Sequence, residues 1–371
     1  MPERRNAFAP LEASIGSQVT TLSAYDVAVG RTVAAIRHPD TEGVLIKTHT
    51  HHAHGWHITS SGLVAGLGSH PGSPTDHRVD LDWLPPAPMA DGVPSGRPTV
   101  RFELGGALRY SASRDDDLHR FRVAGCSEFT ITPEFDRVVC RPAPDVEHDL
   151  TTLLASGAVL SYALTMRGHC VLHASAVEID GDAVALVGAS GFGKSTVTAG
   201  LCATGCQLVT DDVLRVDLQG AAVAHRGARE IRLRPAARVM AGDFDRTPDA
   251  RETADGRLAI QPPMSSHATL PLSAIVLPQP SRDRKNVSLD HVSPAAALKY
   301  LLRFPRVLGW RDIDVLTQQF DQMAVLAHRV PFFVAELPWG PPFSRDASLQ
   351  LAAELSARLR QVSAPAATSS K

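Results

Sequence analysis

Cysteine is scarce in this chain, with five residues among 371, an odd number and too few for a disulfide framework. Cys202 and Cys206 are four positions apart and lack the C-x-x-C spacing of redox or zinc sites. We therefore expect thiols buried in a core and a reducing, cytoplasmic compartment.

Aromatic residues and an excess of one charge are also missing. Only 5% of the residues are aromatic, which argues against the stacking platforms that bind single-stranded nucleic acid. Lysine plus arginine total 37 and aspartate plus glutamate total 39, for a formal net charge of −2, whereas nucleic-acid binders usually carry a basic excess. We therefore expect no nucleic-acid partner.

Long apolar runs are absent as well. The most apolar uncharged stretch, residues 150–166, is interrupted by Ser, Thr and Gly and falls short of the ~20 apolar residues that a membrane span needs. The sequence MPERRNAFAPLEAS at the start has no apolar segment typical of a signal peptide. Because 44% of the residues are hydrophobic, most of the chain is not disordered, and we expect a soluble cytoplasmic protein without membrane contact.

The first part of the chain has the patterns of β-strands. Apolar and charged residues alternate over residues 100–104, which suits a half-buried strand. Residues 128–132 and 137–141 flank a short polar turn and predict a hairpin. The stretch 84–98 is rich in proline and glycine, and we expect a long surface loop there.

A proline-containing break at residues 141–145 marks the predicted domain boundary. We predict a β-rich N-terminal domain over residues 1–145 that recognises the substrate, and an α/β domain over residues 146–371. Residues 150–166 keep a helical period, although Gly157 within it costs about 1 kcal/mol relative to Ala. Strand-like and helix-like segments then alternate, which is typical of an α/β fold. The expected strands are 183–187, 207–210, 274–277 and 332–336, and the expected helices 195–203, 294–303, 314–328 and 347–360.

The strongest motif runs from Gly188 to Ser195 and matches G-x-x-x-x-G-K-[ST] in full. An apolar run precedes it, and helix-compatible sequence follows as far as Gly205. A glycine-rich turn without a ligand explains this strand, loop and helix order poorly. The motif therefore predicts a phosphate-binding loop of the Walker A type.

In such a loop, glycines permit conformations that a Cβ would block, so that backbone N–H groups and the positive end of the helix bind phosphate oxygens. We expect Lys194 to bridge the β- and γ-phosphates of ATP and Ser195 to place its hydroxyl on Mg²⁺. ATP and Mg²⁺ are thus the predicted cofactors. The expected nucleotide-binding residues are Gly188, Ala189, Ser190, Gly191, Phe192, Gly193, Lys194, Ser195 and Thr196.

Two carboxylates, Asp211 and Asp212, follow the short apolar strand predicted at residues 207–210. One carboxylate can hold Mg²⁺, and the other can accept the proton of an attacking hydroxyl. Only 16 residues separate Lys194 from Asp211, fewer than in an ordinary P-loop ATPase, which suggests that the next strand supplies the acids. Aspartate pairs also cap turns, and it is the complete phosphate loop nearby that favours the catalytic interpretation.

Together these residues resemble the catalytic domain of HPr kinase/phosphorylase and, more closely, the shorter HPr-kinase-like serine kinases of bacterial biosynthetic clusters, including those for lasso peptides. The likeness rests on the phosphate loop, on LHASAVEIDG at residues 172–181 and on LVTDD at residues 208–212. It implies a P-loop domain related to phosphoenolpyruvate carboxykinase, with phosphoryl transfer from ATP to a serine hydroxyl. Since relatives form rings of subunits, it leaves a homo-oligomer open.

The resemblance also implies roles for individual side chains. His173 would lie near the transferred phosphate and assist the catalytic base, for which we favour Asp211 over Asp212. As a lone residue, His173 would otherwise be explained as a buried structural histidine. The expected Mg²⁺ contacts are Ser195, Asp212 and Glu230, and Lys194 joins the catalytic group.

One departure from the family concerns the segment after Arg232, which would bind phosphate or support the site. The glycine that follows this arginine in the bifunctional enzymes is Leu233 here. Because that segment is tied to the reverse reaction, we predict a kinase without phosphorylase activity. The first 145 residues do not resemble the regulatory domain of those enzymes, so HPr is not the expected substrate.

The leading hypothesis is therefore a kinase for a serine, or another hydroxyl, of a peptide or protein. The large β-rich N-terminal part favours such a bulky substrate. A kinase for a small-molecule hydroxyl, such as an antibiotic or a sugar, is the first alternative. A nucleotide-gated regulatory module without transfer activity is the second, and the intact Lys194, Ser195 and aspartate pair argue against it.

Five histidines crowd one short segment: His49, His51, His52, His54 and His57. On a strand, alternate histidines share a face and could bind zinc or nickel. A polar strand without a metal explains the pattern better, because no nearby cysteine and no H-E-x-x-H motif completes a site. A surface that becomes charged below about pH 6.5 is a third interpretation.

Arginines recur between residues 225 and 240, and residues 242–264 predict a polar loop with three more. A basic mobile segment beside a nucleotide site could close over ATP or hold an acidic substrate. A solvated surface loop explains the same pattern about equally well.

Overall fold

The computed structural model describes residues 48–68, 77–244, 250–338, 340 and 344–363. These residues all belong to one unit of contacts that spans residues 32–371. The predicted absence of a signal peptide rests on residues outside the described ones, and the cytoplasmic location stays a prediction.

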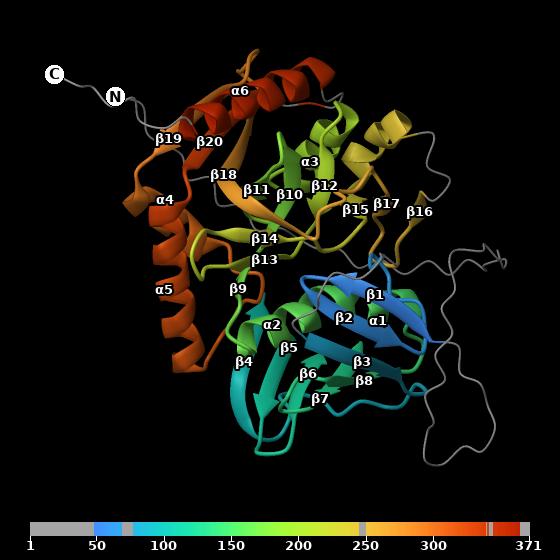
Figure 1. Cartoon of the computed structure of the whole chain (residues 1–371). Coiled ribbons are helices and arrows are strands. Elements are labelled where there is room, and N and C mark those ends of the chain that lie inside the picture. Colours follow the sequence, from blue (N-terminus) through green and yellow to red (C-terminus); the bar gives the residue numbers. More distant parts are fainter. Residues whose placement is uncertain (1–47, 69–76, 245–249, 339, 341–343, 364–371) are drawn as a thin grey trace. The chain divides into compact units, whose positions relative to one another are not determined.

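Strands β1 to β8 form a first sheet (blue to teal in Figure 1), in the order β1-β2-β3-β8-β7-β6-β5-β4. The predicted hairpin is confirmed, because β7 and β8 pair antiparallel with Thr130 opposite Val139. The strand predicted at residues 100–104 lies within β4. The bounds are β1 His49–Ala53, β2 Trp56–Ser60, β3 His77–Trp83, β4 Arg97–Leu104, β5 Ala107–Arg114, β6 His119–Val123, β7 Ser127–Ile131 and β8 Arg137–Pro142.

A helical stretch follows the first sheet and packs against it. Tyr162 and Leu164 share a hydrophobic cluster with Phe121 and Phe129 of the sheet. By length and composition alone this stretch is apolar enough to cross a membrane, which differs from our expectation, and 67% of its most apolar window is buried, as in a core helix. It consists of α1 His148–Leu154, a π-helical turn η1 Ala155–Val159 and α2 Leu160–Met166.

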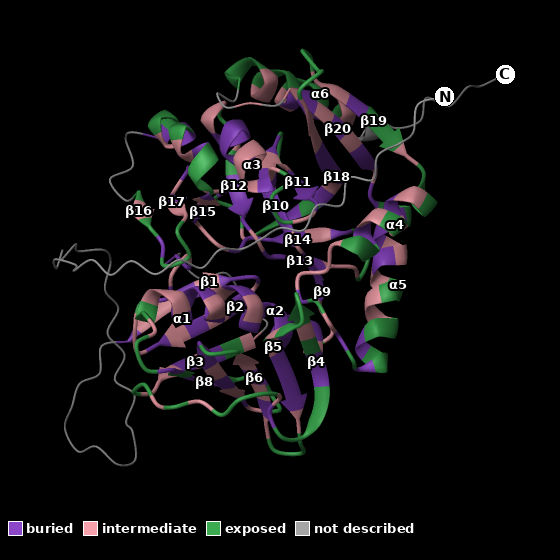
Figure 2. Cartoon of the chain, turned by 180° about the vertical axis from the view of Figure 1, so that it is seen from behind, coloured by how far each residue is buried: buried purple, intermediate pink, exposed green. Residues whose placement is uncertain are grey.

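A second sheet is mixed, with β11, β18 and β20 parallel and their other neighbours antiparallel. Its main path runs β12-β10-β11-β18-β14-β13-β9, and β20 joins β18 to β19. Figure 2 shows how much of this sheet is buried, and β11 is nearly all apolar, as befits a strand covered on both faces. The bounds are β9 Cys170–Leu172, β10 Ala174–Ile179, β11 Asp182–Val187, β12 Gln207–Thr210, β13 Leu214–Asp217, β14 Val223–His225, β18 Thr269–Ser281, β19 Ser288–Val292 and β20 Phe332–Pro338.

Helices cover both faces of the second sheet. Successive residues of β11 point to opposite faces, so Leu186 packs with Leu201 of α3 and Leu355 of α6, whereas Ala185 packs in the cluster of α4 and α5. The coarse prediction of an α/β fold is therefore confirmed, and the HPr kinase type stays a prediction. The helices are α3 Lys194–Ala203, α4 Pro294–Arg303, α5 Ile313–Arg329 and α6 Arg345–Ser363, close to the predicted ranges.

A small third sheet lies where the sequence predicted a polar loop. Its central strand is β17 (Leu258–Ile260), which pairs antiparallel with β15 (Ile231–Leu233) and with β16 (Arg251–Glu252). A 3-10 helix, η2 (Pro235–Phe244), lies between β15 and β16 in the chain. The loop prediction for residues 242–264 is wrong at β16 and β17. The short apolar run Leu258–Ile260 forms a strand in this otherwise polar stretch, because Ile260 pairs with Ile231 and both are buried.

The loop after α4 returns to the first sheet and joins its edge at β4. Arg101 N donates to Gly309 O at 2.8 Å, and Arg311 N donates to Thr99 O at 2.8 Å. Gly309 has a φ of 82°, and a Cβ there would lie 2.2 Å from Arg101 O, so this crossing requires glycine. The two halves of the sequence thus share contacts, and the domain division at residue 145 stays a prediction.

Candidate active site

The predicted phosphate loop joins the end of β11 to the start of α3, as the motif predicts. Gly191 and Gly193 have φ angles of 92° and 84°, in the left-handed region that favours glycine. Gly193 is the N-cap residue of α3, so the positive end of that helix faces the loop. This backbone geometry is suited to binding an anion.

Lys194 lies beneath the loop with only 6% of its surface exposed. Its Nζ donates to Gly188 O at 2.8 Å and to Ala189 O at 3.2 Å. An ammonium has three donor protons, so these two bonds leave capacity for a phosphate oxygen. Burial lowers the pKa of Lys194 to about 8, against the opposing effect of Asp211 and Asp212.

Asp211 lies at the end of β12, 4% exposed, among hydroxyl donors. Ser195 Oγ is 3.0 Å from its Oδ1 and 3.2 Å from its Oδ2, and Ser175 Oγ also donates to Oδ1. The backbone N of Arg232 donates to Oδ2 at 3.3 Å. We did not predict Ser175, which lies in β10 two residues after His173, and His173 itself lies in the bend between β9 and β10. The serine of the phosphate loop and this carboxylate thus form one oxygen-rich group.

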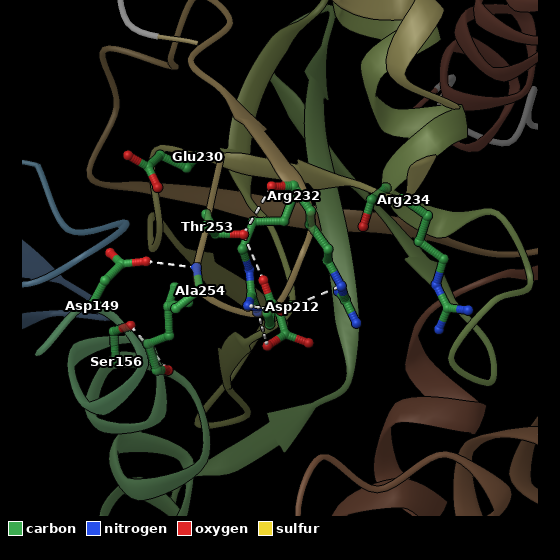
Figure 3. A network of polar contacts seen from close by, with 12 residues as sticks. Asp149, Ser156, Asp212, Glu230, Arg232, Arg234, Thr253 and Ala254 are labelled. Carbon is green, nitrogen blue, oxygen red and sulfur yellow. Dashed lines mark hydrogen bonds and ion pairs between the residues drawn. The ribbon is translucent and has the colours of Figure 1, made fainter. Parts of the chain in front are cut away.

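Asp212 has different partners, which Figure 3 shows at close range. Its Oδ2 accepts from Arg306 Nη2 at 2.7 Å and from Arg232 Nη2 at 3.2 Å, and its Oδ1 lies 3.3 Å from His173 Nε2. Burial raises the pKa of Asp212, but Arg306, His173 and Arg232 outweigh burial and hold it well below its usual range. The carboxylate is therefore ionised at neutral pH.

The backbone of Asp212 is also unusual, with a φ of 72°. Few residues other than glycine adopt this left-handed conformation, and aspartate is among those that tolerate it.

Burial lowers the pKa of the neighbouring His173, although its contact with Asp212 raises it. A neutral His173 can then donate its Nε2 proton to Asp212. The structure thus brings together His173 and both aspartates as the sequence predicts.

A cavity of about 400 Å³ connects these groups. Its polar lining carries five cationic side chains and three carboxylates, an excess of positive charge that suits a polyanion. The cations are Lys194, Arg232, Arg234, Arg257 and Arg306, and the carboxylates are Asp211, Asp212 and Asp255. The loop contributes Ser190, Gly191, Gly193, Lys194, Ser195 and Thr196, whereas Phe192 is 47% exposed.

Glu230, the third predicted Mg²⁺ contact, has other partners in the structure. Its carboxylate lies 3.1 Å from Arg251 Nη2 and 3.2 Å from Gln261 Nε2, and it is 7% exposed. In Figure 3 it lies apart from Asp212, and it is not among the lining residues of the 400 Å³ cavity. Glu230 instead lines a smaller cavity of about 30 Å³ that Asp211 and Asp212 also line, and its role as a metal ligand stays a prediction.

The predicted basic segment divides between the cavity and the scaffold. Arg232 and Arg234 line the cavity, together with Arg257 from the following segment, whereas Arg226 donates to Ser265 O at 3.0 Å. Arg306 is the arginine that sequence reasoning missed. It comes from the loop after α4, 94 positions from Asp212, and no local pattern in the sequence links the two.

Gly157, in the π-helical turn η1, lies directly against the Arg306–Asp212 pair. A Cβ at this position would lie 2.8 Å from Arg306 Nη2 and 3.6 Å from Asp212 Oδ2. The glycine that disturbed the helical pattern in the sequence therefore makes room for a charged contact. Such single π-helical turns are frequent at functional sites.

The histidine-rich segment forms β1 and the turn after it, with His54 in that turn at a φ of 56°. Burial lowers the pKa of His51 to about 4 and that of His54 to about 3, so neither becomes charged near pH 6.5. The third interpretation of the segment is therefore wrong for these two residues. Within the described part of the chain, no group of three or more His, Cys, Asp or Glu side chains is placed to hold a metal.

Comparison with known proteins finds similarity among solved structures alone. No protein-family model matches the chain, and no curated protein does. Among solved structures, the chain is similar to the HPr(Ser) kinase/phosphatase from Coxiella burnetii at 13% identity, over 52% of this chain and 96% of that chain, with a TM-score of 0.27. A likeness at this identity and TM-score assigns neither a fold nor an activity to this chain.

Proposed function

We propose that this protein is an ATP-dependent kinase that transfers the γ-phosphoryl group to a serine hydroxyl of a peptide or protein. The observation that carries the proposal is one cavity lined by the phosphate loop with Lys194 and Ser195, by Asp211 and Asp212, and by His173. A nucleophile's proton acceptor, a phosphate cradle and charge-neutralising cations are the parts that phosphoryl transfer requires.

The residues present fit ATP and Mg²⁺. Ser195 Oγ and the Asp211 carboxylate lie 3.0 Å apart and offer the oxygen donors that Mg²⁺ prefers. When bound there, Mg²⁺ would offset the negative charge of the phosphates. Lys194 and the loop amides would hold the phosphates in line with the acceptor.

The two carboxylates differ in the kind of partner each has. The sequence analysis favoured Asp211 as the base, but Asp211 contacts the hydroxyl of Ser195 in the phosphate loop, whereas Asp212 contacts the cations and the histidine that face the transferred group. We therefore assign metal binding to Asp211 and orientation of the hydroxyl to Asp212. Arg306 and Arg232 would stabilise the charge on the transferred group.

A panel of acceptors tests the proposal. The protein is incubated with ATP and Mg²⁺ and with serine-containing peptides or small alcohols, and the products are examined by mass spectrometry. A peptide that gains one phosphate on serine supports the kinase. Phosphate on small alcohols alone supports the alternative acceptor class, and ATP binding without transfer to any acceptor contradicts the proposal.

The pKa of Lys194 predicts how nucleotide binding depends on pH. Only the protonated ammonium attracts phosphate, and in the free protein its pKa is lowered to about 8. We expect the affinity for MgATP to be constant below pH 7 and to fall as the pH rises through 8, with proton uptake on binding. Calorimetry in two buffers of different ionisation enthalpy measures both effects, and Lys194→Arg should show neither. A flat profile in the wild type to pH 9 would contradict the assignment.

Gly157→Ala tests the contact between the π-helical turn and the charged pair. Alanine favours a helix by about 1 kcal/mol over glycine, so we expect thermal stability to be kept or raised. The new Cβ displaces the Arg306 guanidinium from Asp212, so we expect kcat for transfer to fall at least about ten-fold, or ~1.4 kcal/mol. Gly242→Ala is the control, because Gly242 lies in η2 outside the cavity lining and an added Cβ there meets nothing within 4 Å. A stable Gly157→Ala protein with unchanged kcat would show that the pair needs no such space.

A further inference from the structure

One wall of the active-site cavity is apolar, and the phosphate-binding residues do not explain it. It is formed by α1 and η1 together with two strands of the first sheet, and we call it the apolar wall. The wall has no charged side chain, in contrast with the rest of the lining. It consists of Tyr110, Val123, Leu150, Leu153, Leu154 and Ala158.

The apolar wall borders the end of the cavity that holds Asp212. Ala158 follows Gly157, where a Cβ would lie 3.6 Å from Asp212 Oδ2. On the other flank, Tyr110 Oη accepts a hydrogen bond from Leu308 N at 2.8 Å, two residues after Arg306. Ala158 and Tyr110, on the two sides of the wall, therefore both lie close to the Arg306–Asp212 pair.

The opposite end of the cavity belongs to the start of the phosphate loop. Arg234 Nη2 donates to Ser190 Oγ at 2.9 Å there. In the view of Figure 3, Arg234 lies on one side of Asp212, and Asp149 of α1 and Ser156 of η1 lie on the other. Phosphates bound along the loop would therefore lie between Asp212 and Arg234, with the apolar wall on the other side of Asp212.

We infer that the apolar wall binds the acceptor, and that the acceptor is a peptide serine flanked by a bulky apolar side chain. This inference rests on the proposed kinase function. The cavity of about 400 Å³ is lined both by the phosphate-binding groups and by the apolar wall, so a serine with one apolar neighbour would have its hydroxyl beside Asp212 and the neighbour on the wall. Burial of an aliphatic or aromatic group against the three leucines of the wall is favourable in free energy, whereas burial of a charged group there is unfavourable.

The transfer step is balanced within this arrangement. The serine oxygen forms a bond to the γ-phosphorus as the bond from that phosphorus to the β–γ bridging oxygen breaks. ADP leaves with the electron pair of the broken bond, and the serine proton passes to the Asp212 carboxylate and then to solvent. The products are phosphoserine, ADP and a proton.

Matched peptides test the inference. Two peptides of identical length carry one serine flanked either by leucine and phenylalanine or by aspartate and asparagine, and kcat/KM is measured for each with saturating MgATP. We expect the apolar peptide to be preferred by about ten-fold or more. Hexanol and glycerol, compared in the same way, show whether a free alcohol of either polarity substitutes for the peptide.

Variants of the wall provide the second arm. Leu154 is half-buried in the cavity lining, and Leu154→Lys should remove the preference for the apolar peptide while leaving the KM for MgATP unchanged. Leu154→Ala is the milder variant should lysine disturb folding, and it should reduce the preference in part. Leu349→Lys is the control, because Leu349 lies on α6 and is 46% exposed.

The outcomes separate the acceptor assignment from the proposed kinase function. Equal kcat/KM for the two peptides, a preference for the polar one, or a preference for hexanol over both peptides overturns the acceptor assignment and leaves the kinase standing. A Leu154 variant that raises the KM for MgATP instead places the nucleoside on the wall and also overturns it. If no peptide and no alcohol is phosphorylated, the proposed function itself fails.

Discussion

Lys194→Ala is expected to lose MgATP binding and, with it, transfer activity. The ammonium donates to the backbone of the phosphate loop and is one of the five cationic groups that line the cavity. Removal of one preorganised charge of this kind costs on the order of 10²–10³-fold in rate. Calorimetric titration with MgATP and a turnover assay measure the two effects separately.

Two variants make the Lys194 result specific. Lys299→Ala removes an exposed lysine on α4 and should change neither quantity. Lys194→Arg keeps the charge but not the shape, and we expect partial binding with slow transfer. Undiminished MgATP affinity in a folded Lys194→Ala protein would mean that phosphate binds elsewhere.

Asp211→Asn and Asp212→Asn should fail in different ways. Asp211 contacts Ser195, so its amide variant should need a higher Mg²⁺ concentration and recover in part when Mg²⁺ is raised. Asp212 contacts Arg306 and His173, so its amide variant should bind MgATP normally and lose about 10²–10⁴-fold in kcat at every Mg²⁺ concentration. Initial rates across a magnesium titration separate the two patterns.

The opposite pattern is equally informative. Recovery of Asp212→Asn with Mg²⁺, and none of Asp211→Asn, would restore the assignment of Asp211 as the base. Circular dichroism serves as the fold control, because Asp212→Asn leaves Arg306 and Arg232 facing a neutral side chain. Asp290→Asn, exposed on β19, is the matched substitution that should have no effect.

In the second sheet, β11, β12, β18 and β20 follow from local sequence patterns, as do the helices α3 to α6. β12 and α4 match their predicted ranges residue for residue, since a short apolar run and a Ser-Pro start are strong signals. The three-residue strands β9, β14 and β15 escaped prediction, because so few residues show no period. Their places are set by partners far along the chain, as Ile231 is by Ile260.

The candidate site also combines residues that the sequence predicts with residues that it does not. The phosphate loop and the aspartate pair are contiguous motifs, and the structure places them together. Arg306, Tyr110 and the leucines of α1 reach the cavity only through packing of distant segments, which no single-sequence pattern records. In the sequence, Gly157 is an unfavourable residue within a predicted helix. The structure explains its presence, because a larger side chain there would meet Arg306.

The fate of a labelled phosphate shows whether this cavity transfers a phosphoryl group. The protein is incubated with Mg²⁺ and an apolar-flanked serine peptide, once with ATP labelled at the γ-phosphate and once at the α-phosphate. We expect the γ-label on serine, the α-label in nucleotide alone, and no labelled peptide with Lys194→Ala. An α-label on the peptide, or a γ-label released only as inorganic phosphate, would mean that the cavity does not transfer the γ-phosphoryl group to serine.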